Sequence, residues 1–134
     1  MWQNQVNNTP KCTFYKTIKS SMGLEQYLID LPLNLRICMA KYRMSNHKLP
    51  IEALRYVGID RADRLCTKCN LNKIGDEGHY VLHCTHFSQQ RSSILGIKTA
   101  MVNSEWRLKE LFNGHNSQCY NLAKFVKLIM NVMN

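Results

Sequence analysis

Apolar residues recur along much of the chain at the three- and four-residue spacing of amphipathic helices. Pro32, the stretch Ser45–Pro50, Gly96 and Gly114 interrupt this pattern, because proline and glycine commonly end helices. No stretch alternates apolar and polar residues strongly enough to predict a half-buried strand. The sequence therefore predicts a mainly α fold, with helices over residues 23–31, 33–44, 87–95, 105–112 and 118–133. Residues 51–57 fit either a short helix or an extended segment.

Two of these segments are regular enough to predict which side faces the core. In the 33–44 helix, we expect Leu33, Ile37 and Ala40 to face inward, with Leu35, Met39 and Tyr42 nearby. The polar side of this helix carries three basic residues: Arg36, Lys41 and Arg43. In the 118–133 helix, one side is formed by Leu122, Phe125, Val126, Ile129 and Met133.

The chain divides by composition into three parts. Residues 1–22 are polar and lack clear periodicity, so a flexible arm is expected there. Residues 23–96 form a basic helical segment with a cysteine-rich module centred on 64–87, and residues 97–134 form a helical tail. The sequence contains no internal repeat and no low-complexity tract.

The charge of the chain limits its possible partners. Among 134 residues, 18 Lys and Arg face 9 Asp and Glu, which gives a net charge of +9. This excess favours a polyanionic partner such as nucleic acid, although it also fits a charge that only keeps the chain soluble. There is neither a secretory signal nor an apolar run of membrane-spanning length. We therefore expect an intracellular protein, nuclear or cytoplasmic, that is not secreted and has no membrane partner.

Three of the six cysteines lie with one histidine in a stretch of 19 residues: Cys66, Cys69, His79 and Cys84. Two closely spaced pairs of soft or borderline ligands, separated by a short loop, suit tetrahedral Zn²⁺. The first pair can sit on one tight turn whose N–H groups donate to sulfur, and Asn70 is expected to take a left-handed conformation there. In a reducing compartment, clustered thiols favour metal over disulfides. The expectation is a small, mainly α domain organised around one structural zinc site.

Some alternatives remain open at this site. His83 lies four residues after His79 and could replace Cys84 as a ligand, although thiolate suits a structural site better. His83 and His86 otherwise fit exposed positions, and the cysteines could simply be buried free thiols. Four protein ligands leave no position for a catalytic water. The deaminase signature, a polymerase Tyr-x-Asp-Asp motif and a nuclease carboxylate cluster are all absent from the sequence, so no enzymatic activity is expected.

Basic residues are concentrated in the segment Asn34–Lys73, which holds nine of them against three acidic residues. Basic groups that follow phosphates, together with rings that stack on bases, are typical of single-strand binding. A solvated surface with local ion pairs, for example between Asp60 and Arg61, is the alternative. The candidate nucleic-acid contacts are Arg36, Lys41, Arg43, His47, Lys48, Arg55, Arg61, Arg64 and Lys68.

Two runs of sequence carry a resemblance to a known family. The first is Arg43–Glu52, followed by Arg55, Gly58, Arg61, Arg64 and Cys66-x-x-Cys69; the second is Gly75–Cys84. Together they resemble the C-terminal zinc-binding region of reverse transcriptases from non-LTR retrotransposons. The resemblance covers about Leu35–Phe87 and is weaker over the tail to Asn134. Family members usually carry a bulkier residue where this chain has Gly78.

The resemblance implies a module that follows the polymerase in a longer polyprotein and helps it to hold template RNA or target DNA. It also implies that Cys66, Cys69, His79 and Cys84 are the zinc ligands. The chain is accordingly interpreted as a fragment of such a polyprotein that contacts RNA or DNA phosphates with little base specificity. A zinc-stapled protein–protein interaction module, docking for instance onto the polymerase part, is the second interpretation. A degenerate fragment without function is the third.

Overall fold

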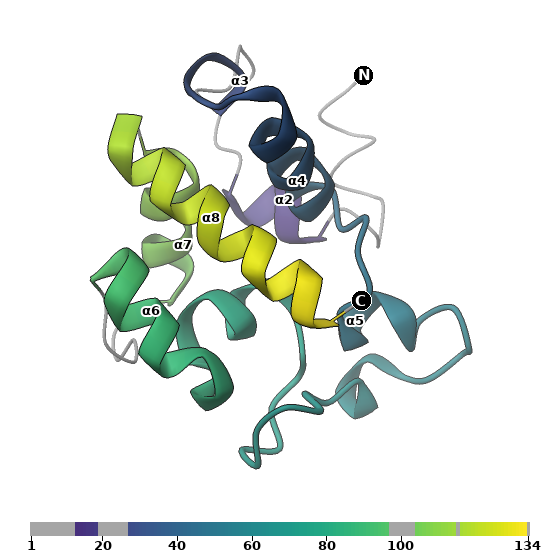
Figure 1. Ribbon diagram of the computed structural model, residues 1–134. Helices are drawn as coiled ribbons and strands as arrows, with labels where there is room; N and C mark the ends of the chain where they lie inside the picture. The colour runs from purple at the N-terminus through teal and green to yellow at the C-terminus, as the bar shows by residue number, and fades with distance from the viewer. Residues whose placement is uncertain (1–12, 19–26, 97–103, 115, 134) are drawn as a thin grey trace.

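The computed structural model of the chain describes residues 13–18, 27–96, 104–114 and 116–133 (Figure 1). Within these ranges the chain is mainly helical, as predicted, and its only β pairing is an isolated antiparallel bridge between Leu65 and Ile74. The longer helices are α4 (Leu33–Arg43), α6 (Ser88–Leu95), α7 (Ser104–Phe112) and α8 (Asn116–Met133). The short helical segments are α2 (Thr13–Ile18), α3 (Tyr27–Asp30), α5 (Pro50–Ala53), η2 (Arg61–Asp63), η3 (His79–His83) and η4 (Thr85–Phe87).

Helix α8 is the central element of the core and packs against both α4 and α6 (Figure 1). Its buried side is the one that the sequence predicts, with Leu122, Phe125, Val126 and Ile129 fully enclosed and Met133 partly buried. Apolar residues recur at helical spacing along α8, so a single face provides this surface. The cluster of buried residues also includes side chains from α4, η3 and α7, so the expected boundary at residue 97 does not separate two cores.

Helix α4 turns a different side to the core than expected. Leu35, Met39 and Tyr42 are buried, whereas Leu33 is 65% exposed and Ile37 is 46% exposed. Apolar residues lie on both sides of this helix, so their spacing alone does not decide its orientation. On the buried side, which packs against α8, the Tyr42 hydroxyl also donates to the backbone oxygen of Glu77 at 2.8 Å.

A buried helix occupies part of the expected N-terminal arm. Phe14, Tyr15 and Ile18 of α2 are buried. The Phe14 ring meets the rings of Tyr42 and Phe112 edge to face, with centroid distances of 5.8 and 5.1 Å. Phe14 and Ile18 are one helical turn apart, a pattern too short to stand out in polar surroundings. The remainder of residues 1–22 lies outside the described residues.

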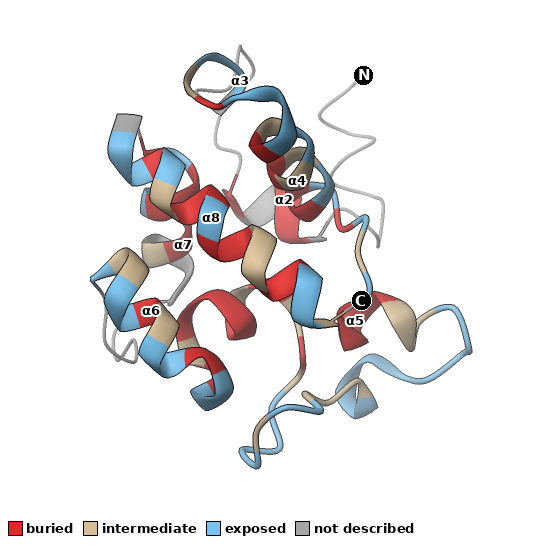
Figure 2. Cartoon of the chain, in the orientation of Figure 1, coloured by how far each residue is buried: buried red, intermediate tan, exposed pale blue. Residues whose placement is uncertain are grey.

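The end of α6 lies where the sequence predicts it, and the most exposed part of the described chain follows α5. Helix α6 ends at Gly96, whose φ of 68° is the left-handed conformation that glycine adopts easily. None of the described helices is both long and apolar enough to cross a membrane. Figure 2 shows that the loops after α5 are largely exposed, whereas η3 is buried. These two regions together carry the candidate site.

Candidate metal centre

The four predicted ligands converge in space. Cys66 and Cys69 lie on the loop that the Leu65–Ile74 bridge closes, while His79 begins η3 and Cys84 directly follows it. Their ligand atoms all lie within 4.8 Å of one another. The expected grouping is therefore confirmed, and the four side chains can hold a metal ion.

Two of the distances within the group match those of tetrahedral coordination. The Sγ atoms of Cys66 and Cys84 are 3.7 Å apart, and Sγ of Cys69 lies 3.5 Å from Nε2 of His79. Metal–sulfur bonds of about 2.3 Å and metal–nitrogen bonds of about 2.0 Å at tetrahedral angles place two sulfurs about 3.8 Å apart and sulfur and nitrogen about 3.5 Å apart. These two distances are those that one ion of this size would set, and the remaining distances in the group do not exceed 4.8 Å.

Backbone hydrogen bonds shape the loop that carries the first pair. The N–H of Cys66 donates to Lys73 O, and the N–H of Gly75 donates to Arg64 O, both at 2.8 Å. The N–H of Lys68 donates to Cys66 Sγ at 3.3 Å, which is the kind of contact expected for this turn. The left-handed residue is Asn72, with φ of 54°, and not Asn70 as predicted. The chain reverses later than expected because the pairing with Leu65 begins only at Ile74.

Gly75 fits this loop closely against α5. A Cβ atom at Gly75 would lie 2.8 Å from Pro50 Cγ and 3.1 Å from the backbone Cα of Cys66. The backbone oxygen of Gly75 also accepts a hydrogen bond from the N–H of Ile51 at 3.1 Å. Only glycine leaves room for this approach, which fixes the Cys66 loop to the start of α5.

A widened helical turn carries the second pair. Residues five apart lie about 140° apart around a regular α-helix, so His79 and Cys84 would diverge there. In η3 the N–H of Cys84 instead donates to His79 O at 2.8 Å, a five-residue bond that brings both side chains to one side. The Asp76 carboxylate accepts from the N–H of His79 at 2.8 Å and thereby caps the first turn.

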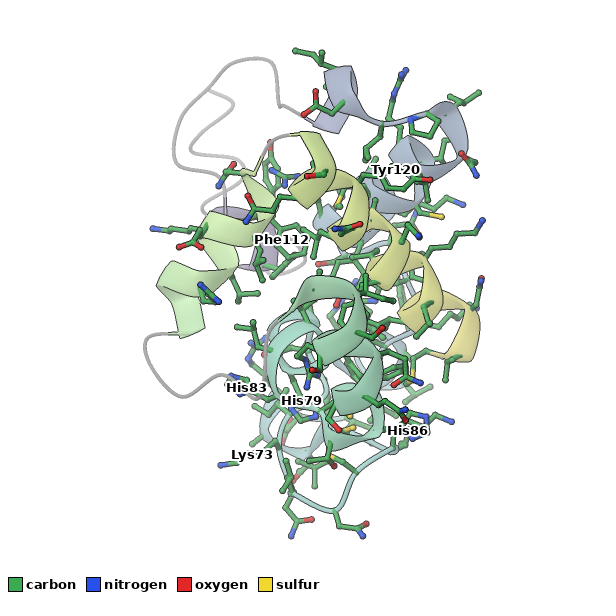
Figure 3. The ribbon with its side chains drawn as sticks, turned by 60° about the vertical axis from the view of Figure 1, so that its left-hand side comes forward. Lys73, His79, His83, His86, Phe112 and Tyr120 are labelled. Carbon is green, nitrogen blue, oxygen red and sulfur yellow. The ribbon has the colours of Figure 1, made fainter. Side chains whose placement is uncertain are left out.

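The same turn explains why Cys84 rather than His83 belongs to the group. His83 would share a face with His79 in a regular α-helix, but in the widened turn it lies outside the group. His83 is half-buried and lines, with His79, an open cavity of about 630 Å³. His86 is exposed, as expected, and its ring contacts Phe87. Figure 3 shows the three histidines, with His83 and His86 to either side of His79 in this view.

The surroundings of the candidate ligands shift their pKa values in different directions. Burial, reinforced by the nearby His83 and Arg91, lowers the pKa of His79 to about 4, so its imidazole is neutral at pH 7. Burial raises the pKa of the Cys84 thiol to about 12, with Cys66 adding to the effect. Burial also acts on Cys66, but the neighbouring Tyr80 hydroxyl and backbone N–H groups more than offset it, so the pKa of Cys66 falls below its ordinary value. A neutral imidazole is the form that binds metal.

Two of the nine candidate nucleic-acid residues are enclosed in the fold. Arg43 is 1% exposed and donates from Nη1 to Phe112 O at 2.7 Å. The His47 side chain is also 1% exposed, and its Nε2 lies 2.7 Å from the carboxylate of Glu77. Both side chains therefore join segments of the fold instead of facing solvent. The partners lie 69 and 30 residues away along the chain, so no local sequence signal indicates these contacts.

The other candidates range from partly engaged to open. Arg36 donates to Leu31 O, Arg55 pairs with Glu52, and Arg64 donates to the backbone oxygens of Ile59 and Ile51. The remaining four, which we call the exposed basic set, lie at exposed positions: Lys41, Lys48, Arg61 and Lys68.

Protein-family models, curated proteins and solved structures were each compared with the chain, and none of them matches it. The class of protein is therefore defined by two features of the chain itself. These are a mainly helical fold and a group of three cysteines and one histidine that can hold a metal ion.

Proposed function

We propose that Cys66, Cys69, His79 and Cys84 bind one structural Zn²⁺ ion and that the domain around it binds RNA or DNA. The observation that carries the proposal is the convergence of these four ligand atoms within 4.8 Å of one another, with two of the distances at tetrahedral values. On this proposal, as the resemblance to non-LTR retrotransposon reverse transcriptases suggests, the chain is a module that helps a polymerase to hold template RNA or target DNA. No catalytic step is assigned to it.

The donor set favours zinc among the common metals. Three thiolates and one imidazole are soft to borderline ligands, whereas Mg²⁺ and Ca²⁺ prefer oxygen. Four protein ligands fill a tetrahedral shell, so no position is left for a reacting water. The ion would staple the Cys66 loop to η3, and its binding energy would contribute to folding.

The exposed basic set supports contact with nucleic acid. Lys41, Lys48, Arg61 and Lys68 project from surface positions, on a chain with a net charge of +9. Tyr56 is 71% exposed and lies beneath the Arg55 guanidinium, 4.7 Å from Cζ to the ring centroid. An exposed ring next to cations can stack on an unpaired base. The expected binding is thus driven by phosphates, with little base specificity.

Metal content tests the first half of the proposal. Mass spectrometry of the purified native protein should find one zinc ion per chain, and Cys66→Ser and Cys84→Ser should each lose it. Cys38→Ser is the matched control, because Cys38 is a half-buried cysteine outside the group. A correctly folded native protein that binds no zinc under these conditions would refute the metal site.

Salt-dependent binding tests the second half. Fluorescence anisotropy with labelled single-stranded RNA and DNA should give an affinity that falls steeply with salt, because binding releases counterions. Reversing the charges of Lys41, Lys48 and Lys68 should reduce both the affinity and the salt slope, whereas Lys124→Glu on the α8 surface should change them less. Arg43 is unsuitable for this test, since a buried acidic residue there would disrupt the fold. An affinity that does not depend on salt would argue against the phosphate interface.

A second candidate function is supported by an exposed apolar surface. Ile29, Leu33 and Ile37 of α3 and α4 are 61%, 65% and 46% exposed, which is unusual for large apolar side chains on neighbouring turns. This surface suits docking onto another protein, such as the polymerase part of the same polyprotein. Leu33→Ser with Ile37→Ser should then abolish binding to such a polymerase in calorimetry while sparing nucleic acid. A chain that binds neither partner would fit the degenerate fragment.

A further inference from the structure

Arg91 is a fully buried charged residue at the back of the candidate metal centre. It belongs to α6, it is 0% exposed, and it is among the largest fully buried side chains. None of the ion pairs found among the described residues includes it. A buried charge without a partner is strongly unfavourable, so the structure must supply negative charge or well-placed acceptors near it.

The Arg91 guanidinium holds the turn that presents His79 and Cys84. Its Nε donates to Val81 O at 2.7 Å, and its Nη2 donates to Tyr80 O at 3.1 Å and to Cys84 O at 2.9 Å. These three carbonyls belong to η3 and to the ligand that comes directly after it. Nη1 has no hydrogen-bond partner among the residues that the structure describes, and Cζ lies 5.9 Å from the centroid of the Phe125 ring.

The missing negative charge is present once a divalent ion is bound. A divalent ion with three thiolates and one neutral imidazole carries a net charge of about −1. The Arg91 guanidinium lies directly against one of the ligands, because its Nη2 donates to the backbone oxygen of Cys84 at 2.9 Å. One buried positive charge thus stands beside one partly buried negative centre, and both are more favourable together than apart.

We propose that Arg91 is the counter-charge of this metal centre and a positioning residue that fixes the turn carrying His79 and Cys84. The proposal rests on the metal site proposed above. It assigns to Arg91 an electrostatic role toward the bound ion, in addition to satisfying the carbonyl groups at the end of η3. It predicts that the contribution of Arg91 to metal affinity depends on the net charge of the ligands.

Zinc affinity in full-length variants tests this role. Competition with a chromophoric chelator should show that Arg91→Met weakens Zn²⁺ binding by about 10- to 100-fold, the usual effect of removing a group that supports metal ligands. Arg91→Lys keeps the charge but not the three-way hydrogen bonding, and should weaken binding by less than about 5-fold. Arg107→Met is the control, because Arg107 pairs with Glu110 on the surface of α7 and should leave the affinity unchanged.

A change of ligand charge separates the electrostatic role from a structural one. Cys69→His converts the group to two cysteines and two histidines, which with Zn²⁺ is neutral, and Co²⁺ absorption spectra verify that it stays tetrahedral. Arg91→Met should then cost less than about 3-fold in this background, because no excess negative charge is left to balance. An equal loss in both backgrounds, or an Arg91→Lys variant as weak as Arg91→Met, would overturn the proposal and leave Arg91 as a structural cap.

Two further outcomes are informative. If Arg91→Met does not fold, Arg91→Lys decides between the roles, because charge balance predicts near-native affinity and a pure cap role predicts a loss as large as that of a disrupted turn. If the native protein itself binds no zinc or cobalt, the metal site fails, and this result is distinct from any difference between the variants.

Discussion

A buried carboxylate ties the region before the candidate metal centre to the break after α4. Glu77 is 4% exposed, and its Oε2 atom accepts a hydrogen bond from the Ser45 hydroxyl at 2.7 Å and lies 2.7 Å from His47 Nε2. Ser45 is 3% exposed and the His47 side chain 1% exposed. Replacement of Glu77 by alanine would therefore leave two enclosed polar groups without their acceptor.

The size of this effect can be worked out from the two contacts. A hydrogen bond to a charged group contributes about 1.5–3 kcal/mol, and Oε2 of Glu77 takes part in two such contacts, with Ser45 and His47. We expect Glu77→Ala to lower the free energy of unfolding by about 3–5 kcal/mol, close to the sum of the two. Glu77→Gln keeps the volume and one acceptor oxygen, so its expected cost is about 1–3 kcal/mol. For a domain whose total stability is of the order of 5–15 kcal/mol, both losses are large.

Urea unfolding followed by far-UV circular dichroism measures these differences, with all variants saturated with zinc so that metal occupancy is equal. The matched control is Glu110→Ala, which removes an exposed pair with Arg107 and should cost no more than about 1 kcal/mol. A Ser45→Ala variant combined with Glu77→Gln should show a coupling energy of about 0.5–3 kcal/mol. If Glu77→Ala and Glu110→Ala prove equally stable, the buried contacts do not have the assigned weight.

Three other predictions rest on the geometry. Zinc affinity measured by chelator competition should rise at least about 10-fold from about pH 6 to pH 8, because metal binding displaces protons from the thiols. One of them is the proton of Cys84, whose pKa is about 12 without metal. An affinity that does not change with pH would contradict coordination by thiolates. Gly75→Ala should lower the free energy of unfolding in urea by about 1–3 kcal/mol and weaken zinc binding, because its Cβ would meet Pro50 and Cys66. Gly58→Ala has open space around it and is strained only by its φ of 81°, so it should lower the free energy of unfolding by about 1 kcal/mol and leave zinc affinity unchanged. Met39→Ala should lower the free energy of unfolding by about 2–4 kcal/mol and Ile37→Ala by less than about 0.5 kcal/mol; the reverse order would favour the helix face predicted from sequence.

Local patterns in the sequence predict those features that depend on neighbouring residues. The inner face of α8 and the end of α6 at Gly96 result from periodicity and from the conformational freedom of glycine. The grouping of Cys66 with Cys84 is predictable from ligand type and spacing, because two close pairs of Cys or His ligands separated by a short loop are typical of structural zinc sites.

Features that depend on distant partners escape this kind of prediction. The inward side of α4 packs against α8, where Tyr42 also bonds to Glu77 O, and the basic residue Arg43 is internal and donates to Phe112 O. In sequence, Arg43 and His47 resemble the exposed lysines beside them. Ligand type favours Cys84 over His83 in the sequence, but the five-residue backbone bond that brings Cys84 to the side of His79 is not anticipated by periodicity at 3.6 residues.

The two halves of the metal centre differ in how the fold supports them. Tyr80, Val81 and Leu82 of η3 are fully buried, so the core and Arg91 hold His79 and Cys84 in place. The loop from Thr67 to Lys73 is mostly exposed, and it is joined to the rest by the backbone bond from Cys66 N–H to Lys73 O and by the contact of Cys69 Sγ with His79 Nε2. Metal binding should therefore stabilise this loop far more than the core.

Hydrogen exchange followed by mass spectrometry tests this asymmetry. Chelation of the metal should accelerate exchange at the amides of Cys66 and Gly75, which bond to Lys73 O and Arg64 O, while amides within α8 stay protected. The Cys38→Ser variant should behave as the native protein does, because Cys38 lies outside the group. Equal loss of protection in α8 would mean that the metal supports the whole core, and unchanged protection at Cys66 would mean that the loop is held without it. The expected result is that removal of the metal destabilises the Cys66 loop and not the core. Because this loop carries the exposed Lys68, nucleic-acid binding should weaken before the helical core unfolds.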